Sequence, residues 1–163
     1  RFWEPVVPDF IEHYSLTNAD RLLDVGCAKG FMLHDFKCAL PHLKVAGIDV
    51  SEYAIEHCIQ SVKDFCEVGN AIELPFEDNE FDVCISITTL HNLEGDDLVT
   101  ALKEVQRVSR RGSFITVDAY TNDQEKEAMY AWNLTAKTIL HVDDWKNLFT
   151  RAGYTGDYYW FMP

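Results

Sequence analysis

An acidic residue followed by small ones forms the part of this sequence whose residue types best suit ligand binding. The stretch LLDVGCAKG, residues 22–30, carries Asp24 near the end of an apolar run and then turns through Gly26, Ala28 and Gly30. Small side chains let a ligand approach backbone amides and carbonyls, and glycine adopts positive φ angles at little cost. The spacing therefore predicts a binding turn, with a purely structural turn as the alternative.

Two nucleotide-binding motifs can be compared with this turn. A P-loop needs G-x-x-x-x-G-K-[ST], but Phe31 stands five residues after Gly26 and Lys29 precedes Gly30. A dinucleotide turn needs G-x-G-x-x-G, but Ala28 and Phe31 stand at its second and third glycine positions. The P-loop is excluded. The dinucleotide turn is disfavoured because its third position needs a small residue, so a dinucleotide-dependent oxidoreductase stays as an alternative.

A second acidic position follows the next apolar run. Asp49 lies in GIDVS, 19 residues after Gly30. An acid at the end of the second strand of such a sheet can accept hydrogen bonds from both ribose hydroxyls of a nucleotide. The alternative is that Asp49 or Ser51 caps the helix that follows.

Two motifs together resemble those of class I S-adenosylmethionine-dependent methyltransferases. Asp-x-Gly-x-Ala-x-Gly resembles the family's Asp/Glu-x-Gly-x-Gly-x-Gly turn, with Ala28 in place of the middle glycine. The stretch GNAIELPFEDNEFDVCISITTLHNL, residues 69–93, resembles the family's G-D-A-x-x-L-P-F and F-D-x-V motifs, with Asn70 in place of the acid. The resemblance covers roughly residues 20–118 and continues more weakly to residue 154.

The resemblance implies S-adenosylmethionine as cofactor and S-adenosylhomocysteine as product. The family's acid after glycine bonds the adenine amino group, and the side-chain oxygen of Asn70 can accept the same hydrogen bond. The residues that the resemblance assigns to cofactor binding are Asp24, Gly26, Cys27, Ala28, Gly30, Asp49, Val50, Asn70, Ala71 and Ser86.

Residues near the ends of later strands are candidates for the acceptor side of the reaction. His91 is the best candidate for a general base, and the alternative is a loop histidine that shapes the pocket or contacts the cofactor. Asp118 and Tyr120 follow the fifth strand, and Tyr14 and Trp132 lie in aromatic segments outside the common core; all four are candidates for binding the acceptor. The predicted reaction is methyl transfer to an O or N nucleophile of a small molecule. A non-catalytic methyltransferase-like partner subunit is the other alternative.

Alternating apolar runs and helical patterns must position these residues. Strands are expected at 22–25, 45–49, 66–68, 81–87, 113–117 and 154–161, and helices at 32–40, 51–62, 96–112 and 143–153, with Gly112 closing the third helix. Residues 120–140 are expected to be irregular. This order predicts an α/β fold: a Rossmann-like, doubly wound, mainly parallel sheet of six to seven strands with helices on both faces. We interpret residues 1–163 as one domain that either contains or lacks the family's final strand.

The last strand-like run raises a question of pairing. The family sheet ordinarily ends with a strand pair, whereas a single aromatic run, YTGDYYWF, follows Gly153 here. That run is expected either to lie directly against the fifth strand or to await a partner. A second copy of the chain, giving a homodimer, is the simplest partner.

Composition limits the partners of the chain. There are 14 basic and 27 acidic residues, a net charge of −13, which disfavours a nucleic-acid substrate. Apolar runs are too short to cross a bilayer, so we expect no membrane association and a cytoplasmic location. Five dispersed cysteines without a CxxC pair favour reduced thiols and no metal site.

Overall fold

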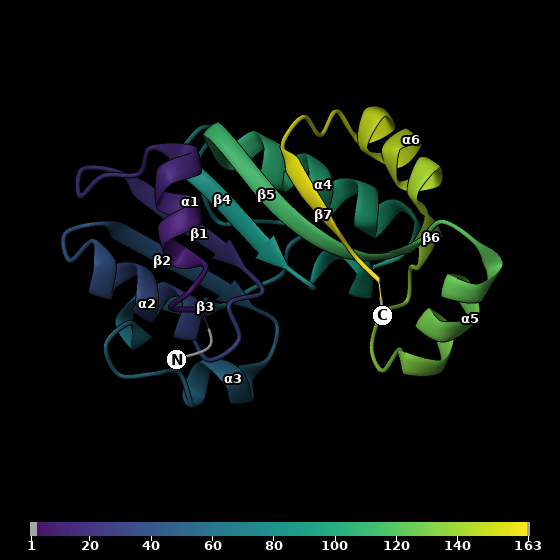
Figure 1. Cartoon of the computed structure of the whole chain (residues 1–163). Coiled ribbons are helices and arrows are strands. Elements are labelled where there is room, and N and C mark those ends of the chain that lie inside the picture. The colour runs from purple at the N-terminus through teal and green to yellow at the C-terminus, as the bar shows by residue number, and fades with distance from the viewer. Residues whose placement is uncertain (1–2, 163) are drawn as a thin grey trace.

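The computed structural model describes residues 3–162 as a parallel sheet flanked by helices (Figure 1). The strands are β1 (Arg21–Val25), β2 (Lys44–Asp49), β3 (Cys66–Val68), β4 (Phe81–Ile87), β5 (Ser109–Tyr120), β6 (Leu140–His141) and β7 (Asp157–Phe161). The helices are α1 (Val7–Tyr14), α2 (Phe31–Ala39), α3 (Glu52–Glu56), α4 (Gly95–Val108), α5 (Asp123–Trp132) and α6 (Val142–Ala152). Two short 3-10 turns, η1 (Lys63–Phe65) and η2 (Leu90–Asn92), complete the set.

The strand order places a crevice at the centre of the sheet. The order is β3-β2-β1-β4-β5-β6, with β7 also pairing with β5, and every pairing among these strands is parallel. The chain winds outward from β1 in one direction and from β4 in the other. Ligands of doubly wound sheets bind at such a reversal, beyond the carboxyl ends of the strands. The predicted fold class is confirmed.

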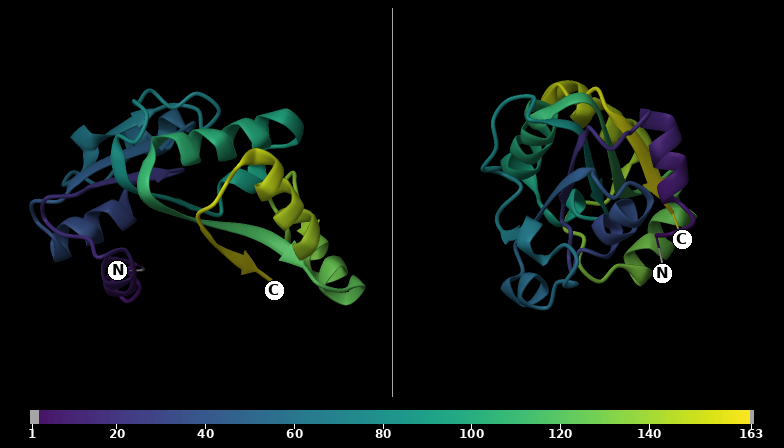
Figure 2. Two further views of the ribbon diagram at one scale, coloured as in Figure 1. Left: turned by 90° about the horizontal axis from the view of Figure 1, so that it is seen from above. Right: turned by 90° about the vertical axis from the view of Figure 1, so that its left-hand side faces the viewer.

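Two apolar cores cover the two faces of the sheet. Strand side chains alternate between them: Leu22 belongs to the core with α1 and α2, whereas Leu23 belongs to the core with α4 and α6. Figure 2 shows α4 on one face and α1 and α2 on the other. Burial on both faces explains why β4 is mainly apolar with no regular polar-apolar alternation, and its two polar residues, Asp82 and Ser86, are buried as well.

One glycine was assigned to the wrong element. Gly112 was expected to close a helix, but α4 ends at Val108 and Gly112 lies inside β5. A Cβ placed on Gly112 would lie 2.8 Å from the Tyr14 ring. This position therefore needs a glycine because α1 packs against it, and not because a helix ends there.

Two further segments differ from expectation. The helix expected over 51–62 ends at Glu56, and Cys58, Ile59 and Val62 face the core from turns. Ser51 caps α3 as predicted, since its Oγ accepts a hydrogen bond from the backbone N–H of Ala54 at 3.1 Å. Residues 120–140, expected to be irregular, contain α5 and the two-residue strand β6.

The terminal strand lies directly against the fifth. β7 pairs with β5 in parallel, from Phe114 with Asp157 to Asp118 with Phe161. The first of the two expected arrangements is therefore confirmed. No other strand in residues 3–162 pairs with β7, and a second copy of the chain on its outer edge stays a prediction. No helix in that range is long and apolar enough to cross a membrane.

Candidate cofactor site

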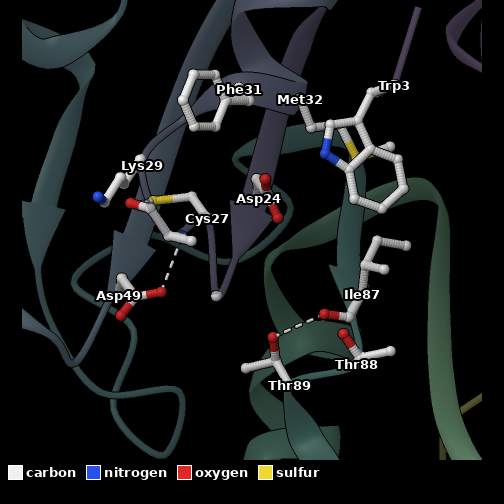
Figure 3. Close-up of a pocket in the computed structure, with 12 residues that line it drawn as sticks. Trp3, Asp24, Cys27, Lys29, Phe31, Met32, Asp49, Ile87, Thr88 and Thr89 are labelled. Atoms are coloured by element: carbon white, nitrogen blue, oxygen red, sulfur yellow. Dashed lines mark hydrogen bonds between the residues drawn. The ribbon is translucent and has the colours of Figure 1, made fainter. Parts of the chain in front are cut away.

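A cavity of about 310 Å³ opens where β1, β2 and β4 end (Figure 3). Its size suits part of a small-molecule ligand. Trp3 and Ile87 lie on one side of the view in Figure 3, and Lys29 and Asp49 lie on the other. The cavity therefore has an apolar wall facing a polar one, at the reversal of strand order.

The glycine turn forms the floor of this cavity in a left-handed backbone conformation. Gly26, Ala28 and Gly30 have φ angles of 87°, 46° and 74°. A Cβ placed on Gly26 would lie 2.0 Å from Oγ1 of Thr89, so a side chain there is excluded by contact as well as by φ. Ala28 adopts the left-handed region with a Cβ present, which costs roughly 1–2 kcal/mol.

Asp49 holds the turn in place. Its Oδ2 accepts a hydrogen bond from the backbone N–H of Ala28 at 2.8 Å, and its Oδ1 accepts one from Ser51 at 2.9 Å. Because Ser51 provides the helix cap, the alternative in which Asp49 caps α3 is wrong. Each carboxylate oxygen can accept a further hydrogen bond, so Asp49 can still receive hydroxyl donors from a ligand.

A smaller cavity of about 140 Å³ adjoins the first and shares Gly26, Asp49 and Thr89 with it. Val50 and Ala71, both predicted, line this second cavity. The predicted Asn70 does not line it. Asn70 is exposed, and its Oδ1 accepts a hydrogen bond from Ile72 at 3.2 Å.

Asn92 is a site residue that sequence reasoning missed. It lines the second cavity, and its Oδ1 is buried without a hydrogen-bond partner in the described part of the chain. Buried acceptors in native proteins nearly always have a partner, so this atom is a candidate acceptor for a hydrogen-bond donor of a ligand. The only signal in the sequence was that Asn92 is a polar residue next to His91 after the fourth strand. The geometry of η2 is needed to show which of these two neighbours lines the cavity.

Asp24 supplies a buried carboxyl group to the first cavity. Its side chain is only 4% exposed. Burial raises the pKa of Asp24 to about 8, and the nearby Cys66 and Asp49 add to the rise. The protonated form is therefore favoured at neutral pH, and a cationic ligand group beside Asp24 would favour ionisation.

Thr88 and Thr89, which sequence reasoning also missed, directly follow β4 and line the first cavity. Thr88 has a φ of 49°, which is rare for a β-branched residue, and its N–H donates to Oγ1 of Thr116 at 2.7 Å. Thr89 donates its hydroxyl to the carbonyl of Ile87 at 3.0 Å. Two hydroxyl residues after a buried strand were the available sequence signal.

His91 is buried and lines neither of the two cavities. Its Nδ1 accepts a hydrogen bond from the backbone N–H of Asp118 at 3.0 Å and lies 3.3 Å from Oδ1 of Asp118. Burial lowers the pKa of His91, and burial raises the pKa of Asp118, with each offset by the other's charge. This placement favours the alternative stated above, in which the histidine shapes the pocket.

The remaining predicted residues lie outside both cavities. Ser86 is fully buried and donates its hydroxyl to the carbonyl of Val25 at 2.8 Å, so it joins two strands. Tyr14 lines a separate groove and bonds Asp157 at 2.7 Å, away from the carboxyl ends. Tyr120 stacks edge-on with His141, and the 56% exposed Trp132 packs near Phe161. The structure does not bring these four residues to the predicted site.

The fold places the two adjoining cavities at the centre of an α/β sheet, where doubly wound domains bind their ligands. Residues 23–117 match the family described as "Methyltransferase domain". The chain belongs to this family, and it is a class I methyltransferase domain, whose cofactor is S-adenosylmethionine.

Individual relatives show how much of a methyltransferase the chain represents. It is 30% identical over 152 residues to the demethylmenaquinone methyltransferase of Symbiobacterium thermophilum, covering 88% of this chain and 59% of the relative. It is 30% identical over 143 residues to the tRNA (carboxymethyluridine(34)-5-O)-methyltransferase of Arabidopsis thaliana, covering 86% of this chain and 33% of that protein. The chain thus spans between a third and three fifths of these two relatives.

A solved structure shares the fold. The YcgJ protein of Bacillus subtilis superposes with a TM-score of 0.71 at 17% identity, over 90% of this chain and 66% of that one. At this identity the similarity shows the fold alone.

Proposed function

We propose that this chain binds S-adenosylmethionine in the two adjoining cavities and transfers its methyl group to an O or N nucleophile of a small-molecule acceptor. The observation that carries the proposal is Asn92, which lines a cavity bounded by Asp49 and Gly26 and whose buried Oδ1 has no hydrogen-bond partner within residues 3–162. This acceptor matches the exocyclic amine of adenine. The neighbouring carboxylate of Asp49 matches the ribose hydroxyls.

The other polar groups fit the amino-acid part of the cofactor. The turn from Gly26 to Gly30 has no side chain larger than a methyl group at positions 26, 28 and 30, so a ligand can reach its backbone. Asp24 lies in the same cavity and can pair with an ammonium group once ionised. We infer that Asp24 and the turn hold the amino-acid part, that Asp49 holds the ribose and that Asn92 holds the adenine.

Orientation is the main contribution that these residues make to the reaction. When bound, S-adenosylmethionine supplies an already activated methyl group. Trp3, Met32 and Ile87 form the apolar wall and would exclude water from that side of the cavity. Correct alignment alone can supply about 7–11 kcal/mol of the barrier. Because His91 is buried and lines neither cavity, we propose that alignment and not a histidine base drives the transfer.

The identity of the acceptor is the finer part of the proposal. The net charge of −13 disfavours a polyanionic acceptor, which supports a small molecule. The relatives include a tRNA methyltransferase as well as a quinone one, so the predicted exclusion of nucleic acid is not confirmed by the comparisons. A non-catalytic partner subunit would bind the cofactor without turnover.

Calorimetry tests the cofactor. Purified protein is titrated with S-adenosylmethionine, S-adenosylhomocysteine and NAD in separate runs, and we expect heat from the first two compounds only. The Asp49→Asn variant should bind more weakly, whereas Asp144→Asn, which changes an exposed carboxylate on α6, should bind normally. Absence of binding by both sulfur compounds at millimolar concentration would overturn the proposal.

Transfer of a radioactive methyl group tests the acceptor. The protein is incubated with labelled cofactor and a cell extract, and the extract is then separated into small-molecule, RNA and protein fractions. We expect label in the small-molecule fraction. Label in RNA or protein would overturn the acceptor class, and cofactor binding without label in any fraction would favour the non-catalytic subunit.

A further inference from the structure

The sulfur atoms of three of the five cysteines lie close together beside the glycine turn. A Cβ placed on Gly47 would lie 2.7 Å from Sγ of Cys27 and 2.9 Å from Sγ of Cys66. A Cβ placed on Gly30 would lie 2.8 Å from Sγ of Cys58 and 3.5 Å from Sγ of Cys66. The sulfur of Cys66 therefore lies close to both glycines, next to the sulfur of Cys27 at Gly47 and next to the sulfur of Cys58 at Gly30.

Cys66 has the lowest pKa of the three clustered thiols. The neighbouring Cys27 and, to a smaller extent, Cys58 lower the pKa of Cys66 to about 7, against an opposing effect of burial. Burial raises the pKa of Cys58 to about 12. Because the thiolate is the reactive form, Cys66 is the nucleophile of the three.

The cluster is a thiol site and not a metal site. No group of three His, Cys, Asp or Glu side chains that could hold a metal ion occurs between residues 3 and 162. The five cysteines are all free thiols. Oxidation is therefore the chemistry that this arrangement supports.

The backbone positions of Cys27 and Cys58 show which of them can form a disulfide with Cys66. Cys66 pairs with Gly47 of β2, and Cys27 lies on the other side of β2, hydrogen-bonded to Ile48. The backbones of Cys27 and Cys66 are separated by two strand spacings of about 4.8 Å each, or roughly 10 Å in all. This separation exceeds the limit of ~7 Å between the Cα atoms of a disulfide. Cys58 lies in the irregular segment after α3, with no strand between it and Cys66. Cys58 can therefore approach Cys66 without moving the sheet.

We propose that Cys58 and Cys66 form a redox modification site that closes to a disulfide when the protein meets a peroxide. The Cys66 thiolate attacks one peroxide oxygen, forming an S–O bond while the O–O bond breaks and the departing hydroxide takes a proton to become water. The Cys58 thiol then loses its proton and attacks the sulfenic sulfur, forming the S–S bond as a second water leaves. Two thiols and one hydrogen peroxide thus give one disulfide and two waters.

The disulfide would disturb the cofactor turn. The N–H of Ile59, next to Cys58, donates to the carbonyl of Lys29 in the turn at 2.9 Å. Gly30 ends the turn, with the two sulfurs packed against it. Drawing Cys58 toward Cys66 shifts both contacts, so we expect oxidised protein to bind cofactor more weakly. This consequence, unlike the disulfide itself, depends on the proposed function.

Peptide mapping tests the disulfide independently of any ligand. The full chain is treated with hydrogen peroxide, blocked with N-ethylmaleimide and digested with trypsin and a glutamate-specific protease under non-reducing conditions. Cleavage after Glu56, Lys63 and Glu67 places the two thiols on HCIQSVK and DFCE. We expect these peptides to be linked in oxidised protein and separate after reduction. No linked pair, or a link between Cys27 and Cys66, would overturn the proposal.

Matched variants test the assignment and its consequence. The link should vanish in Cys58→Ser and Cys66→Ser and persist in Cys84→Ser, which changes a fully buried thiol of β4 outside the cluster. Circular dichroism confirms that each variant is folded. Peroxide should weaken S-adenosylmethionine binding about tenfold, as expected for the loss of one hydrogen bond. A reductant should restore that binding, and Cys58→Ser should resist the change.

The two proposals fail in different ways. Reduced protein that never binds the cofactor overturns the proposed function and leaves the linked peptides as the test of the disulfide. A disulfide that forms without changing the affinity overturns the coupling to the turn.

Discussion

Asp49, Asn92 and Asn70 offer a bound cofactor three different kinds of hydrogen bond. Asp49 is charged and holds the turn, Asn92 is a neutral acceptor that is buried, and Asn70 is a neutral acceptor that is exposed. We expect Asp49→Ala to cost about 1.5–3 kcal/mol of binding, since charge-assisted bonds are the stronger ones. Asn92→Ala should cost about 1 kcal/mol. Asn70→Ala should cost least, because water can replace it.

Calorimetry on the three variants under one buffer measures this order. Thermal melting of each variant without ligand controls for damage to the fold. Equal losses for Asp49→Ala and Asn70→Ala would contradict the roles assigned to them.

The buried carboxyl group of Asp24 makes cofactor binding dependent on pH. Its pKa is raised to about 8, so below that pH the free protein carries a proton there. Pairing with the cofactor's ammonium group requires the ionised form, and binding therefore releases this proton. We expect the affinity to rise between pH 6 and 7.5, by at most about tenfold per pH unit. An α-amino group with a pKa of about 7.7–8.0 stays largely protonated over this range.

Calorimetry at several pH values checks the prediction with Asp24→Asn as the comparison. The variant has no proton to release at this position, so its affinity should stay flat over the same range. A rise of equal slope in both proteins would assign the titration to another group.

At the scale of elements, the glycine turn contains one residue in a costly conformation. Ala28 has a φ of 46°. Replacing it with glycine removes the left-handed penalty of about 1–2 kcal/mol but adds conformational freedom to the unfolded chain worth roughly 0.5–1 kcal/mol. We expect Ala28→Gly to raise the free energy of unfolding by about 0.5–1 kcal/mol. Urea unfolding measures the change.

An alanine outside the left-handed region provides the control. Ala19 is exposed, and its φ is not among the positive ones. Ala19→Gly should lower the free energy of unfolding, because only the entropic effect remains. Stabilisation by both substitutions would show that the left-handed conformation is not the cause.

Elements fixed by local burial were predictable, and elements fixed by distant contacts were not. The bounds of β4 follow from its mainly apolar run, because both of its faces are buried. The glycine turn and Asp49 were likewise found from residue type and spacing. Gly112 was misassigned because its role depends on Tyr14, which lies 98 positions away in the sequence. His91 and Asn92 are adjacent, and only the tertiary structure shows which of them faces the cavity.

At the scale of the whole molecule, net charge separates the acceptor classes suggested by the relatives. The chain carries a charge of −13. Binding to a polyanion depends on displaced counterions and requires clustered basic residues. We expect no binding of bulk tRNA at micromolar protein, even at low salt. Fluorescence anisotropy of labelled tRNA measures this, and a signal that falls steeply with added salt would instead support an RNA acceptor.

Helix α1 and strand β7 join opposite ends of the described chain. Nε2 of His13 and the hydroxyl of Tyr14 bond the Asp157 carboxylate at 2.9 Å and 2.7 Å, across about 140 positions of sequence. During synthesis, α1 leaves the ribosome before β7, and these bonds form only after β7 has emerged. Trp3, just before α1, lines the first cavity. A nascent chain therefore completes the docking of α1, and with it the apolar wall of the cavity, only once β7 is in place.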